Sequence, residues 1–262
     1  MSALFDSSAI PSDKIYSQIR DLPPYELYRS HVEEMWSQFE PYADRGFDKK
    51  IQLSFHQHYW EMYLGNALLQ HGHKIAASLK NHGPDLYLLE NNQKIWVEAI
   101  AVNRGTTEDA PPDLSNSLVE FMPGIKHSGA IAKAFNEDPI LLRYSSAIHN
   151  KYEGRTKYVT DKIVSESDPY VIALNGAETP LCSTKEEPPR IIKALLGIGD
   201  MQYTFDAATM EFIGSAFEER RTVCKKMGVP VHMDIFTDAS HEGLSAVLFS
   251  CVNVVNHPNH IG

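Results

Sequence analysis

Two strand patterns joined at Asn91-Asn92 constrain this chain more than any other feature of its sequence. Residues 85–90 and 94–102 are rich in apolar and β-branched residues, as half-buried strands are. Asn-Asn suits the tight two-residue loop of a β-hairpin. With that loop, the register places Asp85 directly opposite Glu98, and the β-carbons of opposed residues lie about 4.5–5.5 Å apart.

This register divides the side chains of the hairpin between two faces. One face is apolar and consists of Ile95, Val97, Ala99 and Ala101. Trp96 and Glu98 point to the other face, with Tyr87 and Asp85 beside them. Two opposed carboxylates repel each other unless a proton or a cation lies between them. A solvent-facing pair is the alternative, but the two aromatic residues favour a face that is covered.

A third carboxylate lies within a predicted helix that begins after Ser54 and runs to about Gln70. Ser54 and Gln57 fit a capping box, in which each side chain bonds the backbone of the other residue. Glu61 shares a helix face with Leu64, Gly65 and Leu68. An acid among apolar neighbours must be paired, neutralised or bound to a cation. Alternatively, Glu61 lies at the solvent edge of the apolar stripe.

The remaining pattern predicts an α/β protein. Further helices are expected at 25–39 and 141–163, and further strands at 74–79, 169–175, 231–236 and 244–252. Residues 103–140 have no clear period, and residues 201–227 form either a hairpin or a strand followed by a helix. We expect an N-terminal extension (1–53), a core (54–176) and C-terminal strands (177–262) that pack as one compact domain.

Charge and cysteine content narrow the class of protein. The 262 residues include 24 Lys+Arg and 34 Asp+Glu, and the net charge is −10. This charge argues against a protein that coats nucleic acid by bulk attraction, although a local basic groove is compatible with it. Three scattered cysteines form no disulfide framework, which indicates a reducing compartment. With no signal-peptide pattern and no membrane-spanning apolar run, the sequence predicts a cytoplasmic protein.

The acids and the order of the elements resemble the PD-(D/E)xK, or restriction-endonuclease-like, nuclease superfamily. The resemblance rests on Glu61, on Gly83-Pro84-Asp85 and on Trp96-Val97-Glu98-Ala99-Ile100, and it covers under half of the chain. It implies an α-β-β-β-α-β core with a mixed central sheet flanked by helices. It also implies hydrolysis of phosphodiester bonds in nucleic acid, with DNA favoured, assisted by Mg²⁺ or Mn²⁺. Asp85 and Glu98 would be catalytic metal ligands and Glu61 an additional ligand.

The sequence departs from the family pattern where the motif lysine is expected, because that position is Ile100. Some members of the superfamily take this lysine from the following helix, and Lys151 is the candidate here. It borders the apolar stripe that contains Ile148 and Tyr152, from which its ammonium group could reach the acids. The alternative is a lysine that extends to solvent from the edge of the stripe.

Basic residues gather on the same predicted helix and on its approach: Lys126, Lys133, Arg143, Lys151, Arg155, Lys157 and Lys162. We expect Arg143, Arg155 and Lys157 to contact the phosphate backbone of a substrate. A solvated helix face would have the same composition.

Two alternatives to the nuclease remain. Ile100 and the negative net charge also fit a degenerate nuclease-like domain that binds nucleic acid or a protein without cutting. A histidine-rich hydrolase of another fold would bind zinc at His56 and His58. For the nuclease, the resemblance also makes a homodimer possible.

Overall fold

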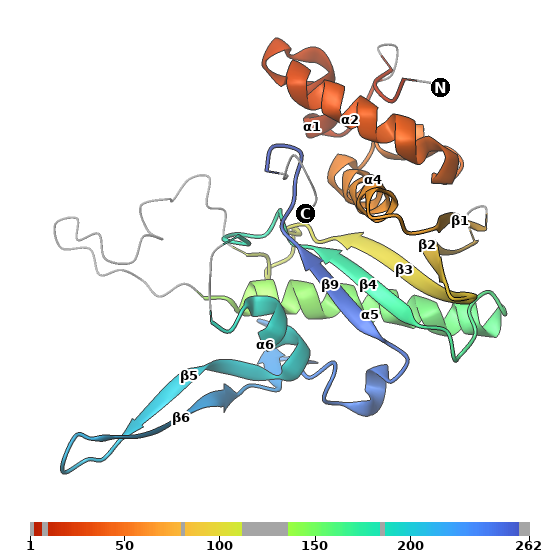
Figure 1. The fold of residues 1–262 in the computed structure, drawn as a ribbon. Helices are drawn as coiled ribbons and strands as arrows, with labels where there is room; N and C mark the ends of the chain where they lie inside the picture. Colours follow the sequence, from red (N-terminus) through yellow and green to blue (C-terminus); the bar gives the residue numbers. More distant parts are fainter. Residues whose placement is uncertain (1–2, 7–9, 80–81, 112–135, 184–186, 257–262) are drawn as a thin grey trace. The chain divides into compact units, whose positions relative to one another are not determined.

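The computed structural model describes residues 3–6, 10–79, 82–111, 136–183 and 187–256. They form an α/β protein with a five-stranded mixed sheet, packed helices and two small hairpins (Figure 1). The chain divides into two compact units. One, the sheet unit, comprises residues 1–101, 148–177 and 243–262, and the other, the hairpin unit, comprises residues 102–147 and 178–242. Each unit is discontinuous in sequence, so the predicted segments 1–53, 54–176 and 177–262 do not correspond to them one to one.

The sheet unit contains most of the regular elements. Its helices are α1 (Lys14–Asp21), α2 (Glu26–Phe39), α3 (Phe47–Lys50) and α4 (Phe55–Gln70), with short 3-10 turns η1 (Pro23–Tyr25) and η2 (Glu40–Tyr42). Its strands are β1 (Ile75–Leu79), β2 (His82–Glu90), β3 (Gln93–Ala101), β4 (Tyr170–Asn175) and β9 (Ala246–Ser250). Helix α5 (Asp138–Thr160) contributes residues to both units.

The hairpin unit is built around two antiparallel strand pairs. Its elements are α6 (Arg190–Leu196), β5 (Ile198–Phe205), β6 (Phe212–Glu219), β7 (Thr222–Cys224), β8 (Pro230–His232) and the turn η5 (Ala239–His241). The strands β5 and β6 settle the alternatives for residues 201–227 in favour of a hairpin. Strand β8 ends at His232, so the predicted strand 231–236 is mostly wrong. Most of the unpatterned stretch 103–140 lies outside the described residues.

The central sheet has the strand order β1-β2-β3-β4-β9. Strands β1, β2 and β3 are antiparallel neighbours, whereas β3, β4 and β9 run parallel. The pairs Tyr87–Trp96 and Glu90–Gln93 confirm the predicted register of the β2–β3 hairpin. At the turn, Asn91 and Asn92 have φ angles of 49° and 64°. Positive φ at both positions is the signature of a type I′ turn, which asparagine tolerates better than most residues.

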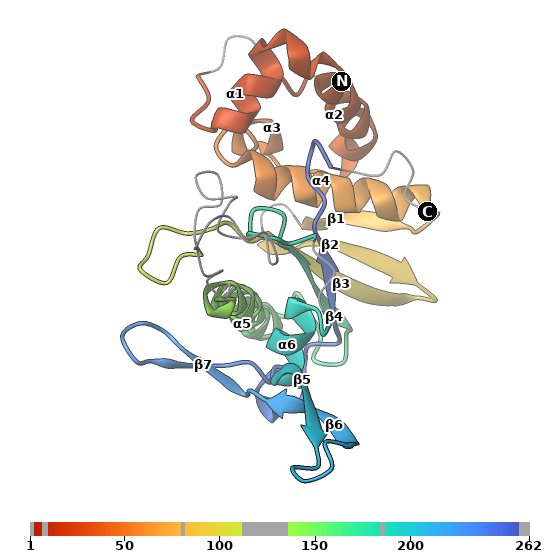
Figure 2. The same cartoon turned by 90° about the vertical axis from the view of Figure 1, so that its left-hand side faces the viewer.

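The two faces of the sheet are covered by different helices. Helix α4 lies on one face and residues 148–160 of α5 on the other (Figures 1 and 2). Val97, Ala99 and Ala173 of the sheet join the core on the α4 side. The indole Nε1 of Trp60 donates to the carbonyl of Ala173 at 2.9 Å, which fixes α4 over the middle of the sheet. The core continues between α4 and the N-terminal helices.

The start of α4 is held differently from the prediction. The side chain of Ser54 forms no capping hydrogen bond, so the predicted capping box is wrong. The carboxylate of Asp13 instead accepts the Phe55 N–H at 2.9 Å, while its other oxygen caps α1. One acid therefore anchors the starts of two helices, and a partner 42 residues away is invisible to a local motif.

The side chain of Gln57 does not cap the helix but forms hydrogen bonds with the sheet. Its side-chain amide donates to the Ala99 carbonyl at 3.2 Å, and its side-chain oxygen accepts the Ala101 N–H at 2.8 Å. These two bonds attach α4 to the backbone of β3 on either side of Ile100. They fix the position of α4 along β3. Glu61, one turn further along α4, is thereby positioned relative to the strand that carries Glu98.

Two findings concern the predicted compartment. Cys182 and Cys251 are disulfide-bonded, which the sequence did not predict, and Cys224 is a free, exposed thiol. The cysteine content therefore no longer supports the prediction of a reducing compartment. Across the described part of the chain, no helix combines the length and the apolar character that a membrane crossing requires.

Substitution of Gly65 tests the close approach of α4 to α2. A β-carbon at Gly65 would overlap the ring of Phe39, so we expect Gly65→Ala to lower the free energy of unfolding by about 1–3 kcal/mol. Gly154→Ala in α5 is the matched control, because its β-carbon would meet Tyr158 at an ordinary 3.8 Å. The better helix propensity of alanine should make that control neutral or stabilising by up to about 1 kcal/mol. Urea unfolding of both variants would contradict this packing if their effects were equal.

Candidate functional site

A buried ion pair joins strand β3 to helix α5. The Nζ of Lys151 lies 2.6 Å from Oε1 of Glu98, and both residues belong to the sheet unit. The Glu98 side chain is 6% exposed and that of Lys151 26%. The interpretation of Lys151 as a lysine that extends to solvent is therefore wrong. Its ammonium group points toward the sheet, because the carboxylate of Glu98 compensates there for the hydration that a buried charge loses.

Asp85 joins this pair from the neighbouring strand. Strand pairing is regular as far as Leu86–Val97, and the next step of that register is Asp85 and Glu98. Oδ2 of Asp85 accepts the backbone N–H of Ala99 at 2.7 Å, so the carboxylate replaces a ladder bond. This bond fixes the Asp85 side chain against β3, beside Glu98. The charge of Asp85 also raises the pKa of Glu98, so the two acids are within electrostatic reach of each other, although the strand pairing itself stops at Leu86–Val97.

Glu61 is buried within α4, with 6% of its surface exposed. Residues 59–66 of this helix are buried without interruption, because α4 lies between the sheet and the N-terminal helices. The interpretation of Glu61 as a residue at a solvent edge is therefore wrong. Burial raises the pKa of Glu61 well above its ordinary value, and the negative charge of Asp85 raises it further.

The carboxyl groups of β2 and β3 also bind protons unusually tightly. Burial, followed by the charge of Asp85, raises the pKa of Glu98 to about 7, although Lys151 opposes the shift. Burial also raises the pKa of Asp85, against the lowering effects of Lys151 and of the Ala99 N–H. Burial disfavours the charged form of Lys151, but Asp85 and Glu98 outweigh it and raise its pKa. One ammonium group thus compensates three carboxyl groups only in part.

Sequence reasoning missed a fourth carboxylate, Asp44. It raises the pKa of both Glu61 and Asp85, so it lies within electrostatic reach of both. Lys50 lies 3.0 Å from Oδ2 of Asp44 and adds a second positive charge. Asp44 precedes Gly46, whose φ of 77° ends the turn before α3. In the sequence it resembles an ordinary turn residue, and no local pattern distinguishes it.

Tyr158 and His58 also border the cluster. Burial and the charge of Glu98 raise the pKa of Tyr158 to about 12, so its phenol stays protonated at neutral pH. Burial lowers the pKa of His58, despite the opposing effect of its Nδ1 contact with the Ser54 carbonyl at 2.8 Å. His58 lies three residues before Glu61, on the same face of the helix, and this spacing was the available signal. Neither residue was assigned to this site from the sequence.

The donor set suits a hard divalent cation in one respect. Oε2 of Glu98 is buried and has no hydrogen-bond partner among the described residues. An oxygen of that kind fits a cation or a proton. Within the described ranges, no three His, Cys, Asp or Glu side chains form a ready-made metal cage. Mg²⁺ does not need one, because it keeps several waters and often takes only one or two carboxylates.

Of the two predicted phosphate contacts in the sheet unit, one is exposed and the other is buried. Lys157 is exposed on α5, as expected for a surface contact. Arg155 is buried, donates to the Glu166 carbonyl at 3.0 Å and lies over the rings of Tyr152 and Tyr170. Its contribution is to packing, so its prediction as a phosphate contact loses its basis.

Arg143 belongs to the hairpin unit and binds Asn103 through its carbonyl and its Oδ1, at 3.0 and 2.8 Å. Lys162 is exposed. Lys126 and Lys133 lie outside the described residues.

The zinc alternative finds no support. His56 is buried and its pKa is lowered by burial, and His58 bonds a backbone carbonyl. In the described part of the chain, neither histidine belongs to a group of three or more side chains that could hold a metal ion.

No family model, no curated protein and no solved structure matches this chain.

The pKa of Glu98 predicts how stability depends on pH in the metal-free protein. Between 4.5, the ordinary value, and about 7, the folded chain holds a proton that the unfolded chain has lost. This stabilisation is present at low pH and is lost as the pH rises through about 7. We therefore expect Glu98→Gln to flatten the fall of unfolding free energy over this range in EDTA. Glu34→Gln, on the exposed side of α2, should leave the profile unchanged, and identical profiles for all three proteins would refute the assignment.

Proposed function

We propose that this protein hydrolyses phosphodiester bonds in nucleic acid, with DNA favoured, using Mg²⁺ or Mn²⁺ held by Asp85 and Glu98. The observation that carries the proposal is the Lys151–Glu98 contact at 2.6 Å. It brings a lysine to the acids from the helix after β3, while Ile100 occupies the position of the motif lysine. The element order α4-β1-β2-β3-α5-β4 supports the proposal, since it corresponds to the core of the PD-(D/E)xK superfamily.

The residues divide the chemistry among them. A bound divalent cation would lower the pKa of a coordinated water and offset the charge that develops on a scissile phosphate. Asp85 and Glu98 supply hard oxygen ligands, and Glu98 Oε2 is available for this purpose. Lys151 then has a second role, because its ammonium group can donate hydrogen bonds to the attacking water and to a phosphate oxygen. Its raised pKa keeps it charged at neutral pH, which suits orientation and charge stabilisation rather than proton abstraction.

Glu61 contributes through its charge and its position. It lies within electrostatic reach of Asp85 and Lys151 and is held over β3 by the Gln57 bonds. With a cation present, ionisation of Glu61 would become favourable, because the cation compensates the charge that burial otherwise penalises. Glu61 would therefore serve as an additional ligand, directly or through a water.

A domain that binds nucleic acid or a protein without cutting is the second candidate. The direct Lys151–Glu98 pair favours it, since a closed ion pair is also a structural element in the absence of metal. A purely structural ion pair does not need further carboxyl groups beside it. Burying them with Glu98 costs free energy, because charged groups lose their hydration when they leave water. Metal binding and cleavage separate the two candidates.

Calorimetric titration with Mg²⁺ and with Mn²⁺ tests the metal ligands. The wild-type protein should bind one cation, and Glu98→Gln or Asp85→Asn should weaken binding about tenfold or more, because each removes a charged ligand. Glu34→Gln is the exposed control and should bind as the wild type does. Binding that is indifferent to both site variants would exclude this pair as the metal ligands.

Cleavage of a labelled DNA duplex and of a matched RNA tests the lysine. Lys151→Met keeps the carboxylates and should retain cation binding, while the cleavage rate falls roughly 100-fold or more. Lys49→Met, an exposed lysine in α3, is the control and should cleave normally. Loss of metal binding in Asp85→Asn with no cleavage by the wild type on either substrate would favour the non-cutting domain. Normal cleavage by Lys151→Met would show that the lysine assignment is wrong.

A further inference from the structure

The exposed apolar side chains of the hairpin unit are concentrated on the β5–β6 hairpin. Residues 203–217 contain six large ones, with exposed fractions between 46% and 72%: Tyr203, Phe205, Met210, Phe212, Ile213 and Phe217. Phe212 packs against Tyr203 and Phe205, with ring centroids 6.3 and 5.9 Å apart. Large exposed patches on a folded protein mark interaction sites more often than chance placement. Tyr203, Phe205 and Phe212 thus form an exposed aromatic cluster on the hairpin.

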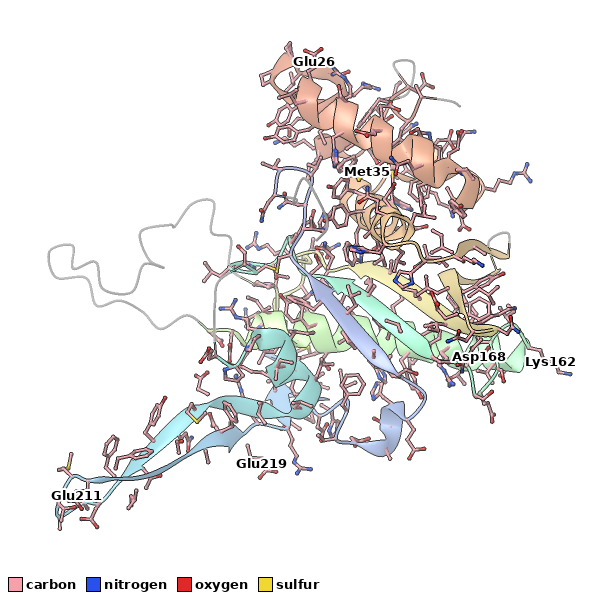
Figure 3. All side chains as sticks on the ribbon, in the orientation of Figure 1. Glu26, Met35, Lys162, Asp168, Glu211 and Glu219 are labelled. Carbon is pink, nitrogen blue, oxygen red and sulfur yellow. The ribbon has the colours of Figure 1, made fainter. Side chains whose placement is uncertain are left out.

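The charge of the same hairpin restricts its partner. Residues 198–219 carry five acids and no Lys, Arg or His: Asp200, Asp206, Glu211, Glu218 and Glu219. Glu211 lies at the tip of the hairpin and Glu219 at its base (Figure 3). Asp200 and Glu219 are paired with Lys193 and Arg221, which leaves Asp206, Glu211 and Glu218 to give the surface its negative charge. Such a surface repels nucleic acid and anionic lipid, since both are polyanions. The hairpin therefore fits a protein surface that is basic and apolar.

The β7–β8 hairpin of the same unit has that character. Residues 220–232 contain four Arg or Lys and one His but no acid. Arg220 pairs with Glu137 and Asp138, and Arg221 pairs with Glu219. Lys225 and Lys226 are exposed in the turn between the strands, beside Met227 and Val229, whose exposed fractions are 88% and 52%.

We propose that the acidic β5–β6 hairpin of one chain docks on the basic β7–β8 turn of a second copy of this chain, and that the contact is reciprocal. The complementarity is of two kinds, because each surface has an apolar centre and the charges have opposite signs. A reciprocal contact uses both surfaces of each chain and closes a two-fold dimer, the commonest form of homo-oligomer. The inference concerns the hairpin unit alone and does not depend on the proposed hydrolysis.

Exchange of the charges gives a test that folding defects cannot imitate. One variant carries Glu211→Lys and Glu218→Lys, and a second carries Lys225→Glu and Lys226→Glu. In either variant alone, the exchanged side chains meet charges of their own sign on the second copy and repel them, so sedimentation velocity should show monomers where the wild type shows dimers. An equimolar mixture restores opposite signs at both contacts and should sediment as a heterodimer. Asp206 is left unchanged, because its side chain accepts the backbone N–H groups of Ala208 and Thr209 in the turn.

The apolar component has its own test. Phe212→Glu should weaken dimerisation about thirtyfold or more, as expected for an aromatic residue at the centre of an interface. Leu27→Glu, at an apolar position on α2 that is 83% exposed against 58% for Phe212, is the control and should leave the dimer intact. A wild-type protein that remains monomeric over a hundredfold range of concentration would overturn the proposal. Dimers in both charge variants alone, with no gain on mixing, would overturn it as well.

Discussion

The ionic contact between Glu98 and Lys151 is the constraint on which the candidate site depends. It lies between β3 and α5, and it is buried on the carboxylate side. Because the carboxylate is buried, water solvates these charges only weakly. The pair is therefore stable only if the surrounding groups compensate both charges. The surroundings do the opposite, because they add the carboxyl groups of Asp85 and Glu61. The result is a site with more acid than base, in which protons or a cation supply the missing positive charge.

The fold places these groups through a few local devices. Positive φ at Asn91 and Asn92 turns the chain tightly, and this turn sets the register that brings Asp85 to Glu98. Gln57 attaches α4 to the backbone of β3, which holds Glu61 at the height of the site. Each device uses ordinary side-chain chemistry. Together they hold like charges close to one another, which is costly in free energy and is typical of functional rather than structural positions.

Much of this arrangement was predictable from the sequence. The turn chemistry gave the β2–β3 register, and alternation in residues 94–102 identified the two faces of the sheet. Position relative to an apolar stripe was enough to nominate Lys151. These features depend on local periodicity, which a single sequence contains.

The parts that could not be predicted depend on contacts distant in sequence. Asp13 caps α4 from 42 residues away, so the capping box expected at Ser54 and Gln57 does not form. Arg155 is buried by Tyr152, Tyr170 and Glu166, none of which marks it as a core residue in the sequence. Asp44 joins the acids only because the N-terminal turn packs near α4. The disulfide-bonded state of Cys182 and Cys251 likewise has no local signal.

Proton release on cation binding tests the central claim most directly. Calorimetric titration with Mn²⁺ at a pH about one unit below the Glu98 pKa of about 7, in two buffers of different ionisation enthalpy, counts the protons released. If the cation replaces protons between Asp85 and Glu98, close to one proton or more should leave for each Mn²⁺ bound, and fewer as the pH rises above 7. Binding without proton release at this pH, or no binding at all, would contradict the account.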